Sequence, residues 1–334
     1  MIKLGINGFG RIGRCVYRVA LQRKDVQVVG INDIEDPKAL AYLLKYDTVM
    51  GRLGMDVACD GDTFKVGDQT TKLFSTRDPA ELPWKELGVD FVIEATGVFR
   101  KRAQIERHLQ AGAPRVILTV PAKDELDATV VLGVNDEVLD KSCKIVSNAS
   151  CTTNCLGPLA KVIHGSFGIE KGLMTTVHAY TNDQRLAEVG NHADVRRSRA
   201  AACNIIPTTT GAAAAVGKVL PQLAGRLDGM AMRVPIPDGS VVDLVAELQS
   251  EVTAEEVNEA VRKAATGPME GILEFCEEPI VSSDIIGNPH SCIFDAALTQ
   301  VIGERMLHVV AWYDNEWGYS NRVVDLAQRL HAAS

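Results

Sequence analysis

The sequence predicts an α/β fold in its first half and an α+β fold in its second. Three observations support this: a glycine-rich turn joins a short apolar strand to a helix, apolar strands then alternate with helices, and long β-rich segments joined by few helices follow. Strands that alternate with helices indicate a parallel sheet covered on both faces, a Rossmann-type domain. The later strands indicate a mainly antiparallel sheet. We expect domains at 1–150 and 151–315 in this chain of 334 residues.

The chain opens on a strand, a glycine loop and a helix. The apolar strand 3–6 is followed by Asn-Gly-Phe-Gly-Arg-Ile-Gly at 7–13, and apolar residues then recur at helical spacing. A second strand, 26–31, leads to Asp33, 20 residues beyond Gly13. In this context the loop is a dinucleotide-binding motif, and an ordinary βα turn is the weaker interpretation.

The glycines and the acidic residue have separate expected roles. Gly8 permits the tight turn, Gly10 lets the backbone approach a pyrophosphate, and Gly13 lets the helix pack on the strand. Asp33 can accept hydrogen bonds from the adenosine ribose hydroxyls.

Further elements complete the predicted first domain. They are a helix at 37–45, short β segments within 51–75, strands at 91–96, 115–120, 129–134 and 145–147, and a helix at 102–110. Ligands of parallel sheets bind at the carboxyl ends of the strands, where Asp33, Thr96 with Gly97, and Thr119 fall.

The second half has strands, a long irregular segment and two further helices. We expect strands at 173–180, 230–234, 241–248 and 308–313, an alanine-rich helix at 211–216 and a last helix at 320–331. The irregular segment 182–204 is too long for a simple connector, so it is functional or forms an interface.

Cys151 stands at the expected start of a helix, within Ser-Cys-Thr-Thr-Asn. The free N–H groups and dipole of a helix start lower the pKa of a thiol and can hold an anion. The alternative is a buried cysteine that acts as a small hydrophobe. His178, at the end of an apolar strand, is the best placed of seven histidines to act as a base, and a structural histidine is its alternative.

A thiol and a nicotinamide cofactor together restrict the chemistry. A thiolate adds to an aldehyde, the adduct gives up a hydride, and an energy-rich thioester remains. Anion-binding groups are present as well: Thr210 and Gly211 begin the alanine-rich helix, Arg197 lies in the irregular segment, and Arg233 needs a partner in an apolar strand. Singly these residues cap helices or pair with carboxylates, but jointly they can form two phosphate pockets.

Composition narrows the class of protein. Hydrophobic residues make up 46% of the chain and charged residues 23%, as in globular proteins, and the net charge of −8 argues against a general nucleic-acid binder. No apolar run approaches the ~18 residues of a membrane span, and the chain begins on a strand, so we expect a cytoplasmic protein. The eight cysteines have neither a disulfide framework nor zinc-ligand spacing, so no metal is expected.

Five segments resemble the phosphorylating glyceraldehyde-3-phosphate dehydrogenases, and the resemblance runs nearly end to end. These segments are 5–14, 147–154, 176–185, 199–211 and 312–319. The resemblance implies NAD-dependent conversion of D-glyceraldehyde 3-phosphate and inorganic phosphate to 1,3-bisphosphoglycerate, with Cys151 as nucleophile and His178 as base. It also implies a homotetramer in which 182–204 is the S-loop between subunits, and a last helix (about 316–334) that returns to the cofactor domain.

The resemblance further implies the binding residues. Thr181 and Arg233 would hold the substrate phosphate. The attacking phosphate would be held by Ser150, Thr152, Arg197 (in preference to Arg196), Thr210 and Gly211. NAD would be held by Arg11, Ile12, Asp33, Arg77, Thr119, Asn315 and Tyr319, together with the glycine loop.

Two features leave alternatives open. Val189-Gly190-Asn191 replaces the proline-containing sequence common in NAD-specific members, which leaves room for some use of NADP. Erythrose-4-phosphate dehydrogenase shares the Ser-Cys-Thr-Thr-Asn core, although Thr181 resembles the triose enzyme. A dinucleotide-binding scaffold that acts as a non-enzymatic interaction protein is the alternative of another class, and the presence of Cys151 and His178 argues against it.

Overall fold

The computed structural model describes residues 1–190 and 194–333, and their packing divides the chain into two compact units. The first unit comprises Met1–Val130, Glu137–Ala149 and Ser320–Ser334, and the second comprises Val131–Asp136 and Ser150–Tyr319. None of the helices among the described residues is long and apolar enough to cross a membrane.

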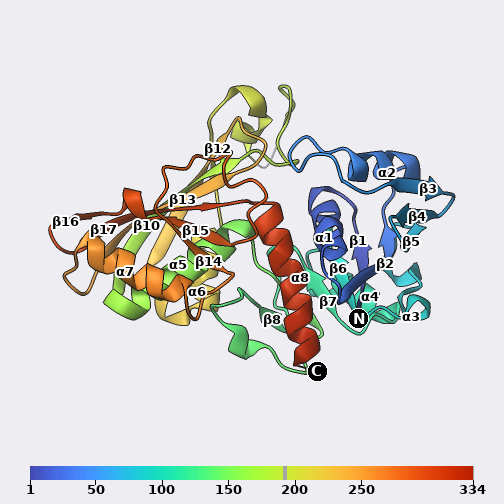
Figure 1. The fold of residues 1–334 in the computed structure, drawn as a ribbon, viewed down its shortest axis with the longest axis horizontal. Helices are drawn as coiled ribbons and strands as arrows, with labels where there is room; N and C mark the ends of the chain where they lie inside the picture. The colour runs from blue at the N-terminus through green and yellow to red at the C-terminus, as the bar shows by residue number, and fades with distance from the viewer. Residues whose placement is uncertain (191–193, 334) are drawn as a thin grey trace. The chain divides into compact units, whose positions relative to one another are not determined.

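A nine-stranded sheet forms the centre of the first unit (Figure 1). Its order is β3-β4-β5-β2-β1-β6-β7-β9-β8. The strands are β1 (Ile2–Asn7), β2 (Val26–Asn32), β3 (Val57–Asp60), β4 (Thr63–Val66), β5 (Gln69–Phe74), β6 (Phe91–Glu94), β7 (Val116–Leu118), β8 (Ala128–Thr129) and β9 (Ile145–Ser147). Pairing is parallel from β5 to β8 and antiparallel from β3 to β5, so the predicted Rossmann-type sheet is confirmed.

Five helices belong wholly or mainly to this unit. They are α1 (Arg11–Leu21), α2 (Pro37–Lys45), α3 (Trp84–Leu87), α4 (Arg102–Gln110) and α8 (Trp317–Ala332). From Ser320 onward α8 packs on the first unit, where Arg23 bonds Asp325 at 3.2 Å and Gln328 donates to Asp25 at 2.6 Å.

The strand predicted at 129–134 is wrong beyond Thr129. The valines and the leucine of residues 130–134 are buried, but the chain turns here, and the Val134 N–H donates to the Val131 carbonyl at 2.9 Å. This turn belongs to the second unit, where the Lys161 ammonium donates to the carbonyls of Gly133 and Val134 at 2.8 Å. A short apolar run indicates burial, but it does not distinguish a strand from a buried turn.

An eight-stranded mixed sheet forms the second unit, with the order β11-β12-β10-β13-β17-β15-β14 and β16 paired to β17. The strands are β10 (Ile169–Ala179), β11 (Ile206–Thr209), β12 (Leu227–Val234), β13 (Ser240–Leu248), β14 (Leu273–Cys276), β15 (Cys292–Asp295), β16 (Gln300–Ile302) and β17 (Met306–Tyr313). The sheet is mainly antiparallel, as predicted, but β10 and β12 run parallel, as do β14 and β15.

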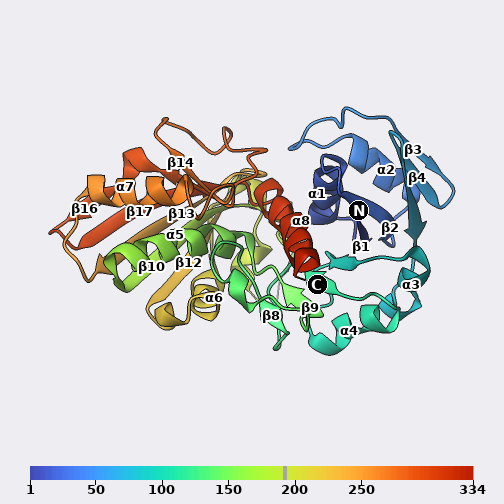
Figure 2. The same cartoon turned by 60° about the horizontal axis from the view of Figure 1, so that its bottom comes forward.

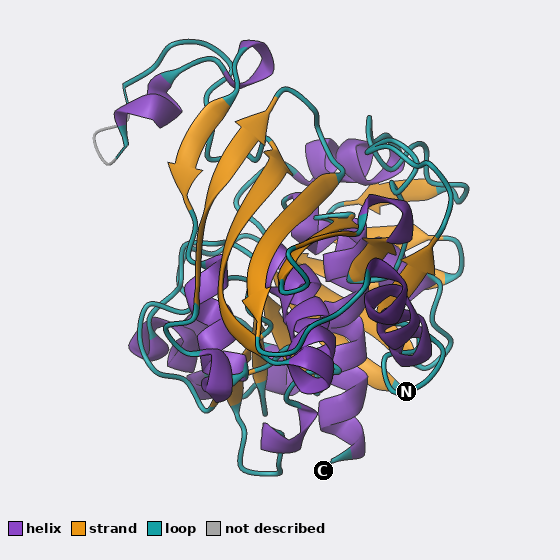
Figure 3. Ribbon diagram, turned by 90° about the vertical axis from the view of Figure 1, so that its left-hand side faces the viewer, coloured by secondary structure: helices purple, strands orange, loops and turns teal. Residues whose placement is uncertain are grey.

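Helices cover one face of this sheet. They are α5 (Cys151–Phe167), α6 (Ala212–Val219) and α7 (Ala254–Ala265). Figure 2 shows α5 and α7 lying along the strands, and Figure 3 shows the opposite face without a helix over it. In β10 the side chains of Met174, Thr176 and His178 are buried, whereas Leu173 on the other face is 69% exposed.

The glycine loop between β1 and α1 depends on close backbone contacts. Gly8 has φ +92°, a conformation that favours glycine. A Cβ atom on Gly13 would lie 2.1 Å from the Gly8 carbonyl oxygen, whereas one on Gly10 would meet no heavy atom within 4 Å. Gly13 is therefore required for packing, and Gly10 is not.

We predict that Gly13→Ala lowers the free energy of unfolding by about 3 kcal/mol, because the added methyl group would overlap backbone atoms. Thermal unfolding measures the loss. Gly10→Ala is the matched control, and its unfolding temperature should stay close to that of the wild type. Equal stability of the two variants would contradict this account of the loop.

Candidate active site

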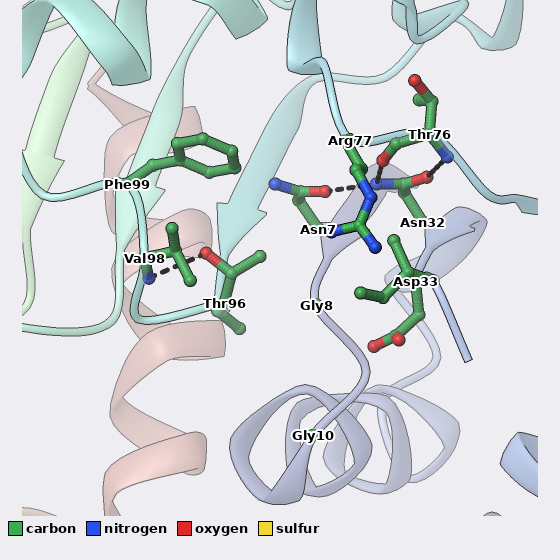
Figure 4. Close-up of a pocket in the computed structure, with 12 residues that line it drawn as sticks. Asn7, Gly8, Gly10, Asn32, Asp33, Thr76, Arg77, Thr96, Val98 and Phe99 are labelled. Carbon is green, nitrogen blue, oxygen red and sulfur yellow. Dashed lines mark hydrogen bonds between the residues drawn. The ribbon is translucent and has the colours of Figure 1, made fainter. Parts of the chain in front are cut away.

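The first unit carries a pocket of about 410 Å³ where β1, β2 and β6 end (Figure 4). Its lining includes the predicted cofactor residues Gly8, Gly10, Asp33, Arg77 and Thr96. This is the edge of a parallel sheet at which nucleotides bind, and the central position of β1 between β2 and β6 makes it the switch point of the strand order.

Backbone donors hold Asp33 at the edge of the pocket. Its Oδ2 accepts the Phe9 N–H at 2.6 Å, and its Oδ1 accepts the Glu35 N–H at 3.0 Å. Each carboxylate oxygen can accept a second hydrogen bond. Asp33 is therefore fixed in place and still able to accept from ribose hydroxyls.

A buried hydrogen-bond network lies beside this pocket. The Glu94 carboxylate, which is fully buried, accepts from Asn7 Nδ2 at 2.6 Å, from His108 Nε2 at 3.0 Å and from the Thr96 N–H at 2.9 Å. The Trp84 indole N–H donates to His108 Nδ1 at 3.1 Å, so the imidazole proton is assigned to Nε2, which faces Glu94. The network fixes the turn that begins at Thr96.

The sequence interpretation missed this network. Asn7 also accepts from Asn32 Nδ2 at 2.7 Å, and Asn32 Oδ1 accepts the Thr76 N–H at 2.9 Å, which ties three segments of the pocket wall together (Figure 4). The available signal was Glu94 itself, because a carboxylate in an apolar strand needs a partner.

Other predicted cofactor residues lie outside the pocket lining. Ile12 and Gly13 are in the first turn of α1, and Arg11 forms an ion pair with Asp47. Thr119 donates to the Glu94 carbonyl at 3.0 Å, and Gly97 follows Thr96 with φ +70°. Asn315 and Tyr319 belong to the second unit, and both are buried.

Cys151 and His178 meet in the second unit. Cys151 is the first residue of α5, and the hydroxyl of the N-cap residue Ser150 accepts the Thr153 N–H at 3.1 Å. Cys151 Sγ lies 3.4 Å from His178 Nε2. The residue before the cap, Ala149, has φ +54°, which is uncommon for a residue other than glycine and often marks a functional site.

Arg233 lies directly beside this pair, because the parallel register of β10 and β12 sets it opposite His178. Its guanidinium is 2.8 Å from His178 Nδ1, and it donates to the Ala179 carbonyl at 3.0 Å and to Thr181 Oγ1 at 3.2 Å. Ala179 O is also 2.7 Å from Nδ1. Nδ1 can thus donate to the Ala179 carbonyl or accept from Arg233. In the first case Nε2 faces Cys151 without a proton, and in the second case it carries one.

Burial disfavours a charge on either member of this pair, and Arg233 disfavours it on His178 alone. Burial raises the pKa of the Cys151 thiol, and the Arg233 charge opposes this effect. Because the Cys151 side chain is only half-buried, contact with water reduces the rise in pKa that burial causes. Burial, and next the Arg233 charge, lower the pKa of His178 to about 3. At neutral pH a neutral imidazole therefore faces the thiol.

The predicted anion-binding residues form two groups. Thr181 donates to Asp183, and Asp183 also pairs with Arg197, which joins the irregular segment to Thr181 and Arg233. Arg197, and not its neighbour Arg196, makes this ion pair with Asp183. The sequence interpretation missed Asp183.

The second group lies at two helix starts. Thr152 Oγ1 is 2.8 Å from the Tyr313 hydroxyl, which also contacts Thr176 at 2.8 Å. Thr210 Oγ1 accepts the Ala212 N–H at 3.2 Å, and Gly211 is the N-cap residue of α6. The sequence interpretation missed Tyr313, which links α5 to β10.

Comparisons with known proteins identify the sequences that this chain resembles. Residues 2–102 match the glyceraldehyde 3-phosphate dehydrogenase NAD-binding domain model, and residues 150–315 match the C-terminal domain model of the same family. The chain is 56% identical over 327 residues to glyceraldehyde-3-phosphate dehydrogenase 2 of Streptomyces avermitilis. It is 56% identical over 333 residues to the enzyme of Mycolicibacterium smegmatis and 57% identical over 332 residues to that of Mycobacterium tuberculosis. Each match covers 97% of both chains.

We predict that Arg233→Ala slows alkylation of Cys151 by iodoacetamide several-fold at neutral pH, because loss of the positive charge raises the pKa of the thiol. The rate should be measured against pH, with the labelled cysteine identified by mass spectrometry. The profile should shift to higher pH in this variant. Arg226→Ala is the control, since Arg226 bonds the Ile169 carbonyl at the other end of β10. A wild-type profile for Arg233→Ala would refute the electrostatic role.

Proposed function

Since this chain belongs to the glyceraldehyde-3-phosphate dehydrogenase family, we propose that it oxidises D-glyceraldehyde 3-phosphate with NAD and inorganic phosphate and releases 1,3-bisphosphoglycerate and NADH. The observation that carries this proposal is the distance of 3.4 Å between Cys151 Sγ, at the start of α5, and His178 Nε2. A thiol and a base in contact at a helix start suit covalent attack on an aldehyde.

Cys151 is the proposed nucleophile. Its sulfur attacks the aldehyde carbon while His178 Nε2 accepts the thiol proton and passes it to the carbonyl oxygen, and the product is a hemithioacetal on Cys151. NAD, when bound, supplies the acceptor for the hydride that leaves this carbon. His178 takes the hydroxyl proton of the adduct as the thioester forms. Attack of inorganic phosphate on the thioester then releases the acyl phosphate and returns the Cys151 thiolate.

Arg233 and Thr181 are the proposed ligands of the substrate phosphate, and their mutual hydrogen bond of 3.2 Å supports a common role. The attacking phosphate would be bound at the helix starts and by the irregular segment. Its proposed ligands are Ser150, Thr152, Arg197, Thr210 and Gly211. Both sites would combine side-chain donors with helix N-termini or a guanidinium, as phosphate sites do.

The residues of the first unit fit NAD. The pocket, the Gly8–Gly13 loop and the Asp33 carboxylate would accept the adenosine and pyrophosphate, with Arg77, Thr96, Gly97 and Thr119 around them. Arg11 and Ile12 would contribute from the start of α1. Asn315 and Tyr319 are the proposed ligands of the nicotinamide end.

Asp33 favours NAD over NADP, because a 2′-phosphate would bring negative charge against its carboxylate. We propose a clear preference for NAD with some use of NADP. Val189 and Gly190 are exposed, which leaves space beside them, while Asn191 lies outside the described residues. The relatives carry the name of the triose enzyme, so neither erythrose-4-phosphate dehydrogenase nor a non-enzymatic scaffold is favoured.

A homotetramer in the cytoplasm is the proposed state of the enzyme. The uncovered face of the second-unit sheet exposes Leu173 (69%), Met306 (50%), Val245 (38%) and Met230 (36%), and the segment 182–204 exposes Leu186 and Val195. Apolar groups gathered on one face indicate an interface. The free cysteines of the described chain suit a reducing compartment.

We predict that omission of inorganic phosphate limits NADH formation to a burst of about one equivalent per active site, because the thioester on Cys151 then waits for slow hydrolysis. Stopped-flow absorbance measures the burst. Cys151→Ser should lose it, while Cys59→Ser, which alters another half-buried cysteine, should keep it. Sustained turnover without phosphate would exclude phosphorolysis.

We predict that Leu173→Asp converts the assembly to smaller species, because the carboxylate would be buried in an apolar interface. Size-exclusion chromatography with light scattering measures the mass. Val281→Asp, at an apolar loop position that is 57% exposed, is the control and should leave the mass unchanged. An intact tetramer in Leu173→Asp would place the interface elsewhere.

A further inference from the structure

The turn between β12 and β13 holds a buried carboxyl group that the proposed mechanism does not use. Asp238 is 2% exposed, and its Oδ1 accepts the Gly239 N–H at 2.9 Å. Its Oδ2 is also buried, and within the described part of the chain no donor reaches that atom. A buried carboxylate oxygen without a donor is costly, so the group either carries a proton or destabilises the fold.

The neighbouring acid, Asp314, is the better site for the negative charge. Its Oδ1 accepts the N–H groups of Glu316 and Trp317 at 2.9 and 2.6 Å, and its Oδ2 accepts the Gly287 N–H at 2.7 Å. Hydrogen bonds to a carboxylate stabilise its ionised form, and Asp314 has three such bonds where Asp238 has one. The proton of this pair therefore belongs to Asp238.

The electrostatic surroundings agree with this assignment. Burial, and then the charges of Asp314 and Glu316, raise the pKa of Asp238 to about 9, and Asp314 lies near enough to accept a hydrogen bond from a protonated Asp238. An ionised Asp238 would also raise the pKa of the Cys151 thiol on α5, and a protonated one would not. The hydrogen bond needs the proton, because two ionised carboxylates have no donor between them.

The same turn orients the amide of Asn315. Ser240 Oγ accepts the Ala179 N–H at 3.1 Å, so its single proton goes to Asn315 Oδ1 at 2.6 Å. The amide nitrogen of Asn315 is then the end that can donate to a ligand. The turn is thus joined to the Asp314–Asn315 segment twice, through Asp238 and through Ser240.

We propose that Asp238 is a positioning residue that keeps its proton at neutral pH and uses it to hold the Asp314–Asn315 segment in the orientation that binds the carboxamide end of NAD. The inference rests on the role of Asn315 proposed above. In this role Asp238 acts through its protonated form and contacts neither substrate nor cofactor.

The first test is NAD affinity against pH, measured by calorimetry from pH 7 to 10. The wild-type dissociation constant should rise as the pH passes about 9, where Asp238 loses its proton. Asp238→Asn, whose amide donates without titrating, should lack this rise. Asp238→Ala should bind NAD about tenfold more weakly already at pH 7, since a hydrogen bond to a charged group is lost.

Asp228→Asn is the matched control. Asp228 stands at the other end of β12 and accepts the N–H of the following glycine at 2.7 Å, as Asp238 does, but it is exposed. Its profile should follow the wild type. The same alkaline rise in Asp238→Asn as in the wild type would overturn the inference.

Thermal stability provides a second readout. The folded pKa of Asp238 is raised, so between about pH 4, where an unfolded aspartate ionises, and pH 9 the folded state holds one proton more than the unfolded state. The free energy of unfolding that is lost by burying Asp238 therefore grows as the pH rises through this window. The gain in unfolding temperature of Asp238→Asn over the wild type should grow from pH 4 to 9 and then level off. A constant difference would contradict the assigned proton.

Asn315→Ala separates this inference from the function on which it rests. If this variant binds NAD as tightly as the wild type, the role of Asn315 in the proposed function is wrong, and the inference fails with it. If the variant weakens NAD binding but Asp238→Asn keeps the wild-type pH profile, only the inference fails.

Discussion

The contact between Arg233 and His178 is the interaction on which the proposed active site depends. It arises from the backbone, because the parallel pairing of β10 and β12 sets the two residues opposite each other. Two parallel neighbours need a long connection, and here that connection contains the irregular segment 182–204. The same segment brings Arg197 to Asp183 beside Thr181. The strand register therefore places His178, the proposed base, beside the Arg233 guanidinium. It also requires the long connection that carries the second arginine, Arg197.

Buried carboxyl groups are accommodated in two ways in this molecule. Glu94 is fully buried, and its carboxylate accepts hydrogen bonds from Asn7, His108 and Thr96. Asp238 accepts from one backbone N–H and lies near a second acid, so its protonated form has the lower free energy. The two buried groups thus differ in the number of hydrogen-bond donors around them.

Local patterns predicted the parts of the fold and site that local chemistry determines. The glycine spacing of residues 7–13 and the cap at Ser150 act over a few residues, and the helices at 37–45 and 102–110 end where the sequence predicted. Contacts between distant segments leave no such pattern. Thus Asp183, Tyr313 and the Glu94–His108 pair were missed. The predicted strand 129–134 was wrong beyond Thr129, because residues 131–134 form a turn of the other unit.

The neutral state of Cys151 and His178 determines how the thiol can lose its proton. Transfer of the thiol proton creates a thiolate and an imidazolium, and the Arg233 charge stabilises the first and destabilises the second. The guanidinium lies 2.8 Å from Nδ1, while the sulfur lies beyond Nε2 at the far end of the ring. Coulomb energy falls with distance, so Arg233 opposes the imidazolium more than it favours the thiolate. The imidazolium–thiolate pair is therefore disfavoured in the resting site. A thiolate that reacts with an alkylating reagent there forms instead by loss of the thiol proton to solvent while His178 stays neutral, and the Arg233 charge favours that loss.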